Sequence, residues 1–199
     1  MSESIDWKSE RIRAVKESIE FFHNANKLER EKWVVARLLE NFIPEFSEGL
    51  LHEAEEPADV KFKDASFQVK EVLEHNRRRG DEYKKSLEKA ETAEEDRDLL
   101  EGYSPYKVSF DEIVNQCYEY SKKLTKKYGP KERKNLDFIC YFNYLDSNEV
   151  PPVKVSLTEK HYRSFSVISN RYRSVIYTAD EAPEFLKQQV GIVVDILVK

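Results

Sequence analysis

Four polar residues carry the strongest chemical signal in this sequence. Asp59 comes two positions after a proline, Gln68 and Lys70 follow it closely, and Glu40 belongs to the helical pattern that precedes them. A carboxylate and a second oxygen donor are the ligands that Mg²⁺ or Mn²⁺ takes in sites that cleave phosphodiesters, and a neighbouring Lys stabilises the developing negative charge. Asp59 and Gln68 are therefore candidate metal ligands, and Lys70 is a candidate catalytic residue beside them.

A β-hairpin would bring three of these residues together. Residues 58–62 and 67–73 alternate between apolar and polar side chains, which is typical of strands, and the short polar segment 63–66 suits a turn. Because successive side chains point to opposite faces of a strand, Gln68 and Lys70 share one face. Antiparallel pairing then predicts that Asp59 lies beside them, with Glu40 nearby.

The rest of the sequence predicts a mixed α/β fold. Apolar spacings of three and four residues predict helices at 12–22, 28–42 and 110–124, and a solvated, highly charged helix at 74–100. Aromatic and β-branched runs predict strands at 135–145, 164–169 and 173–178, with a helix start and a final strand in 180–199. Together these elements predict a central mixed sheet flanked by helices, with residues 1–199 forming a single domain.

The composition excludes several classes of protein. Two cysteines without ligand spacing form neither a disulfide framework nor a zinc finger, and the five glycines form no phosphate-binding loop. No apolar stretch approaches the roughly 20 residues that a membrane span needs, and the N-terminus has no secretory signal pattern. We therefore expect a cytoplasmic protein without a membrane partner.

Basic clusters suggest a nucleic-acid partner. The net charge is -5, so DNA would have to meet a local basic face. Segment 122–134 has seven basic residues and one acidic residue. Two other basic segments supply the residues that we predict to bind DNA phosphates, namely Arg77, Arg78, Arg79, Lys84, Arg163, Arg171 and Arg173. For each cluster taken alone, a solvated helix face is the more common explanation.

The stretch from Pro57 to Lys70 resembles the P-D…[D/E]-x-K motif of the restriction-endonuclease-like superfamily. Together with His-Asn-Arg-Arg-Arg at 75–79, it resembles more closely a proteobacterial family of unknown function that carries the name of an endonuclease. The resemblance implies hydrolysis of DNA with Mg²⁺ or Mn²⁺. By this resemblance, Asp59 matches the metal-binding Asp of the motif, Gln68 the second ligand position and Lys70 the catalytic Lys. Glu40 matches an acidic residue that a helix often contributes to complete the metal and catalytic site.

Gln68 departs from the motif, which has Asp or Glu at that position, and this leaves two functions open. A neutral amide supplies an oxygen but no charge, so the metal affinity should be lower. One function is a metal-dependent endodeoxyribonuclease with weakened catalysis. The other is a non-catalytic binding or regulatory protein that keeps the fold and serves a protein partner. A hairpin with a solvated polar face produces the same residue pattern without any metal.

Overall fold

The computed structural model describes residues 6–73, 79–99, 106–143, 147–152, 157 and 159–198. Within this part of the chain there are two compact units. Unit 1 contains the described residues of 1–30 and 74–104, and unit 2 contains those of 31–73 and 105–199. The single domain expected over 1–199 stays a prediction.

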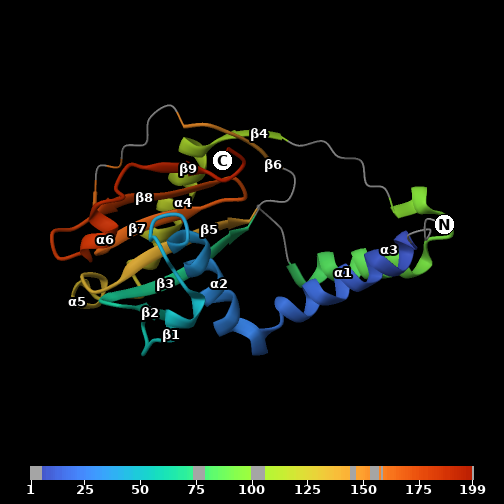
Figure 1. The fold of residues 1–199 in the computed structure, drawn as a ribbon, viewed down its shortest axis with the longest axis horizontal. Coiled ribbons are helices and arrows are strands. Elements are labelled where there is room, and N and C mark those ends of the chain that lie inside the picture. Colours follow the sequence, from blue (N-terminus) through green and yellow to red (C-terminus); the bar gives the residue numbers. More distant parts are fainter. Residues whose placement is uncertain are drawn as a thin grey trace. The chain divides into compact units, whose positions relative to one another are not determined.

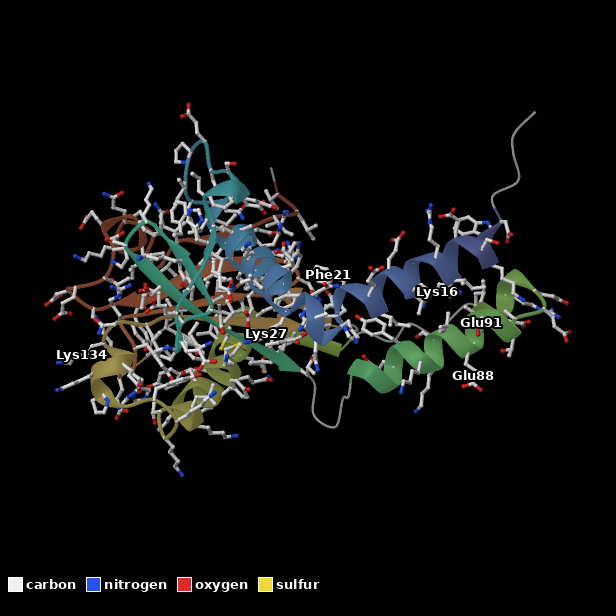
Figure 2. All side chains as sticks on the ribbon, turned by 90° about the horizontal axis from the view of Figure 1, so that it is seen from below. Lys16, Phe21, Lys27, Glu88, Glu91 and Lys134 are labelled. Carbon is white, nitrogen blue, oxygen red and sulfur yellow. The ribbon has the colours of Figure 1, made fainter. Side chains whose placement is uncertain are left out.

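Unit 1 is formed mainly by two helices (Figure 1). Its elements are α1 (Trp7–Phe21), the 3₁₀ turns η1 (Asn24–Asn26) and η3 (Asp96–Leu99), and α3 (Arg79–Thr92). The Phe22 ring stacks on Tyr83 with centroids 5.4 Å apart, and Lys16 on α1 lies 3.9 Å from Glu91 on α3 (Figure 2). A charged helix in this segment is thereby confirmed over 79–92, shorter than the expected 74–100, and α1 packs against it; residues 74–78 and 100 lie outside the described part.

Unit 2 is built on a seven-stranded sheet of order β1-β2-β3-β5-β7-β8-β9. Central strands β3, β5 and β7 run parallel, and the outer pairs are antiparallel. The strands are β1 (His52–Glu53), β2 (Val60–Phe62), β3 (Ala65–Leu73), β5 (Asp137–Asn143), β7 (Ser164–Ile168), β8 (Tyr172–Thr178) and β9 (Val193–Asp195). A separate parallel pair consists of β4 (Tyr106–Ser109) and β6 (Ser147–Val150). The predicted mixed α/β class is confirmed.

The two faces of the large sheet have separate cores. The helices of unit 2 are α2 (Lys27–Leu39), which begins in unit 1, α4 (Phe110–Leu124), α5 (Pro130–Arg133) and α6 (Glu184–Lys187), with a 3₁₀ turn, η2, at Glu48–Leu50. Leu38 of α2 packs in one core with Phe67, whereas Ile113 of α4 packs in the other with Phe138. Central strands covered on both faces are buried along nearly their whole length, as expected for parallel strands.

The hairpin differs from the expectation in its turn. Only Lys63 and Asp64 connect the strands, and the positive φ of 52° at Lys63 reverses the chain within two residues. Val60 pairs with Phe67 and Phe62 with Ala65, so β2 is only three residues long. The β3 edge beyond Phe67 therefore lacks a β2 partner.

Local signals explain the best-predicted helix. The Ser109 side chain accepts from the Glu112 N–H at 3.2 Å, and Glu112 in return accepts from the Ser109 N–H at 2.7 Å, which is a capping box at the start of α4. By contrast, β1, β4, β6 and α5 were not expected, because elements of two to four residues are too short for a periodic pattern. None of the helices in the described part of the chain is long and apolar enough to cross a membrane.

Candidate functional site

The hairpin brings Asp59, Gln68 and Lys70 together at the free edge of β3. Gln68 Nε2 donates to Asp59 Oδ2, and the Val69 backbone N–H donates to the same oxygen at 2.8 Å. Lys70 Nζ lies 3.6 Å from Asp59 Oδ2 and donates to the Val69 carbonyl at 2.9 Å. The Asp59 carboxylate thus takes the place of the strand partner that β3 lacks beyond Phe67.

The Gln68 amide is held at both ends. Gln68 is 2% exposed, and its Oε1 accepts a hydrogen bond of 2.7 Å from the Tyr128 hydroxyl. Tyr128 is also buried, in the turn between α4 and α5. An amide can donate to a carboxylate and accept from a hydroxyl, whereas an ionised Glu can only accept. Gln is therefore the residue that satisfies both Asp59 and Tyr128.

The structure does not bring Glu40 into this group, which corrects the expectation. Glu40 follows α2 directly, and α2 packs on the sheet face that carries Phe67 and Val69. Gln68 points to the opposite face because strand side chains alternate. The Glu40 carboxylate instead lies 3.2 Å from Arg37, one helical turn away.

Two of the oxygens that were expected to bind a divalent cation already accept hydrogen bonds. Mg²⁺ needs oxygen ligands with free lone pairs in near-octahedral geometry. Asp59 Oδ2 already accepts two hydrogen bonds, and the single side-chain oxygen of Gln68 accepts from Tyr128. Within the described residues, no three His, Cys, Asp or Glu side chains gather where they could hold a metal. We therefore assign no metal to the group.

Two arginines that were predicted to bind DNA form ion pairs with carboxylates of the protein. Arg163 Nε donates to Asp137 Oδ1 at 3.1 Å, and its Nη2 pairs with Asp137 Oδ2. Arg171 Nη2 lies 2.7 Å from Asp195 Oδ2, and the hydrogen bond from Arg171 lowers the pKa of that carboxyl group. Arg173 is 5% exposed and so is not on the surface. The placement of these three residues gives no support to their predicted contacts with DNA.

The other predicted phosphate contacts fall within residues 77–84 of the sequence. Arg77 and Arg78 lie outside the described residues, and for Arg79 only the backbone, at the start of α3, is described. Lys84 is exposed on α3. The role of these four residues in DNA binding stays a prediction.

An exposed basic face surrounds the turn that contains Tyr128, and we call it the lysine surface. Its members are Lys122, Lys123, Lys126, Lys127, Lys131 and Lys134, all exposed. None of the six forms an ion pair with a described carboxylate. Lys127 Nζ lies 5.3 Å from the centre of the Tyr128 ring, and Figure 2 shows Lys134 projecting away from the ribbon. The excess of basic residues in segment 122–134 was the signal for this surface.

A second polar group lies at the carboxyl ends of the parallel strands. The strand registers align Glu71 of β3, Tyr141 of β5, Ile168 of β7 and Arg173 of β8 in one row across the sheet, on the α2 face. Asn143 Nδ2 donates to Glu71 Oε1 at 2.8 Å. Open α/β sheets bind ligands at this edge. Sequence reasoning missed the row because its strands are far apart in the chain.

Comparisons with known proteins point to a family and a fold. Residues 4–198 match the model of the DUF1780 family, which is described as "Putative endonuclease, protein of unknown function". A solved structure of a protein of unknown function from Pseudomonas aeruginosa strain PAO1, described as monooxygenase superfamily, is similar with a TM-score of 0.63 and 22% identity, over 98% of this chain and 96% of that chain. This likeness shows the fold alone. No curated protein matches the chain.

Proposed function

Because the chain belongs to the DUF1780 family, whose description names an endonuclease, we propose that it acts on nucleic acid and binds the phosphate backbone through the lysine surface. The observation that carries this proposal is the set of six exposed lysines without a described carboxylate partner. Each lysine that neutralises a phosphate releases condensed counterions, which supplies most of the free energy of non-specific binding.

The single acidic side chain in this segment is held at the start of α5 by a hydrogen bond. Glu132 Oε2 accepts from the Gly129 N–H at 2.6 Å, so the carboxylate is turned back onto the start of α5. The chain as a whole has a net charge of -5 and repels DNA elsewhere. The lysine surface, beside Tyr128, is therefore the proposed binding face, in addition to the contacts predicted at Arg77, Arg78, Arg79 and Lys84.

Hydrolysis of the bound strand is a second candidate function, and the position of Lys70 favours it. Lys70 keeps 22% of its side chain exposed, and its ammonium group lies 3.6 Å from the Asp59 carboxylate. An ammonium group at this place could stabilise the charge that develops on a phosphate under attack. The Gln68 bridge opposes dependence on Mg²⁺ or Mn²⁺, since Tyr128 would first have to release Gln68 Oε1.

Fluorescence anisotropy with a labelled DNA duplex, and with one of its strands alone, tests binding. We expect the triple variant Lys122→Gln, Lys126→Gln, Lys131→Gln to bind at least about tenfold more weakly at low salt. Lys187→Gln on α6 is the matched control, because Lys187 lies 3.6 Å from Glu184 and should not contact DNA. Binding that is absent in the wild type, or equal in the triple variant, contradicts the proposal.

Cleavage is tested separately with supercoiled plasmid in Mg²⁺ or Mn²⁺. Lys70→Met is the informative variant because Lys70 is partly exposed, so the fold should survive its loss. If hydrolysis is a true activity, this variant should bind DNA like the wild type and fail to nick it. A wild type that binds plasmid and never nicks it rules out hydrolysis and leaves the binding function.

A further inference from the structure

Arg173 is a buried cation that forms no ion pair with a described residue. It is 5% exposed, and its Nη1 donates to the carbonyls of Ser169 and, at 3.0 Å, Tyr172. Its Nε is buried without a hydrogen-bond partner, and its Nη2 forms no hydrogen bond in the described part of the chain. A buried guanidinium with unused N–H groups is unfavourable unless a further acceptor completes it.

Arg37 brings a second unused donor to the same face of the sheet. Its Nη1 and Nη2 each lie 3.2 Å from a carboxylate, those of Glu40 and Glu48, but its Nε is buried without a partner. Arg37 belongs to α2, the helix that packs on the face to which Arg173 points. Two guanidinium groups therefore each keep an unused, buried Nε–H.

Charged neighbours do not remove this need for an acceptor. Burial lowers the pKa of Arg173, whereas Tyr141, Glu149 and Glu40 raise it and Arg37 lowers it. Glu149 is already occupied, because its carboxylate accepts from the Ser169 hydroxyl and from two backbone N–H groups. These carboxylates compensate the charge of Arg173 from a distance but leave its Nε–H unsatisfied.

Aromatic rings border the two arginines. Trp33 and Tyr141 contact each other edge to face with centroids 5.6 Å apart, and the Arg37 guanidinium lies 5.8 Å from the Trp33 ring centre. Tyr141, near the carboxyl end of β5, stands in the same row as Arg173, at the amino end of β8. Rings of this kind offer stacking surfaces to a planar base.

We propose that Arg37 and Arg173 bind a phosphate group carried by a nucleotide, where α2 faces the carboxyl end of β5 and the amino end of β8. The Nε–H and Nη2–H of Arg173 form one side of a guanidinium fork, which matches two phosphate oxygens. Trp33 and Tyr141 supply the contact for the base. The site lies on the opposite sheet face from Gln68, so it does not depend on the lysine surface.

Titration calorimetry with inorganic phosphate and with deoxyadenosine monophosphate tests the site. We expect Arg173→Gln and Arg37→Gln to weaken both probes roughly tenfold or more, since each removes hydrogen bonds to a charged group. Lys187→Gln on α6, outside both proposed sites, is the control and should bind both probes like the wild type. No binding of either probe by the wild type, or unchanged binding by both arginine variants, overturns the proposal.

The test remains informative even if the Arg173→Gln variant does not fold. Arg37 keeps a third of its side chain exposed, so Arg37→Gln should fold even where Arg173→Gln does not. Phosphate should raise the melting temperature of the wild type and not that of Arg37→Gln, and an equal rise in both overturns the site. Arg37→Gln should bind the DNA duplex like the wild type, which separates this site from the proposed backbone binding.

A second comparison identifies the source of the phosphate. Oligonucleotides with a 5′-phosphate and with a 5′-hydroxyl are compared in the triple lysine variant, where backbone binding is weakened. If the phosphorylated strand retains binding that Arg37→Gln abolishes, the site takes the end of a strand. If only the mononucleotide binds, the site takes a free nucleotide. Equal binding of both strands, undiminished by Arg37→Gln, contradicts a phosphate site.

Discussion

The Tyr128 hydroxyl donates to Gln68 Oε1 at 2.7 Å, so the side chain that departs from the nuclease motif is part of a buried bridge. The other end of the amide donates to Asp59, which in turn caps the free edge of β3 through the Val69 N–H. The motif residues therefore stabilise the hairpin and its contact with α4. Any nuclease chemistry at this site has to be reconciled with that structural role.

Gln68→Glu should lower the free energy of unfolding by about 2 kcal/mol at pH 7. Two carboxylates would then face each other in a buried site, and the hydrogen bond that Gln68 donates to Asp59 would be lost. The introduced carboxyl group would have a raised pKa in the folded state, so the loss should shrink as the pH falls below that pKa and the group regains a proton. Urea unfolding at pH 5 and pH 7 measures both effects. Gln68→Met, which adds no charge, is the control without this pH dependence.

The Asp137–Arg163 pair should contribute strongly to stability. Asp137 is fully buried and accepts from the Ser66 N–H at 2.9 Å, from the Ser164 hydroxyl at 2.8 Å, and from Arg163. Asp137→Asn removes the charge and leaves the guanidinium uncompensated, at a cost of about 3–5 kcal/mol. Chemical denaturation of this variant, of Arg163→Met and of the double variant measures the coupling. Strictly additive losses would show that the pair is not coupled.

Alkaline pH should destabilise the protein through Tyr177. Burial raises the pKa of Tyr177 from 10.0 to about 12, and the His161 and Tyr162 N–H groups that donate to its hydroxyl lower it. Above pH 10 the unfolded chain loses the tyrosine proton while the folded protein keeps it, so stability falls between pH 10 and 12. The shift corresponds to about 2–3 kcal/mol. Circular dichroism unfolding should show a smaller alkaline loss for Tyr177→Phe, and identical losses would contradict this assignment.

Salt should weaken DNA binding in proportion to the number of lysines that contact phosphate. A plot of log affinity against log salt concentration should become less steep by about one for each contacting lysine that is replaced by Gln. Lys122→Gln, Lys126→Gln and Lys131→Gln are measured singly, with Lys187→Gln as the control of unchanged slope. A wild-type affinity that is independent of salt would show that the lysine surface does not bind phosphates.

Part of the site could be predicted because its geometry is local. Alternation along a strand places Gln68 and Lys70 on one face, and a hairpin over a few residues brings Asp59 to them. The basic excess in segment 122–134 likewise marks a solvated stretch whose lysines are exposed. Glu40 was expected near Asp59, but α2 packs on the other face of the sheet. Local periodicity does not determine which face of a sheet a helix will cover.

The sequence by itself determined the helices with regular apolar spacing, the hairpin, the capped start of α4 and the mixed α/β class, because each depends on residues that are neighbours in the chain. Only the tertiary structure decided which distant residues contact those elements. Tyr128 reaches Gln68 across 60 positions of sequence, and Arg173 is buried because strand registers and α2 enclose it. A periodic pattern determines which side chains share a face. It contains no information on the distant residues that pack against that face, and those residues determine hydrogen bonding, burial and charge at both candidate sites.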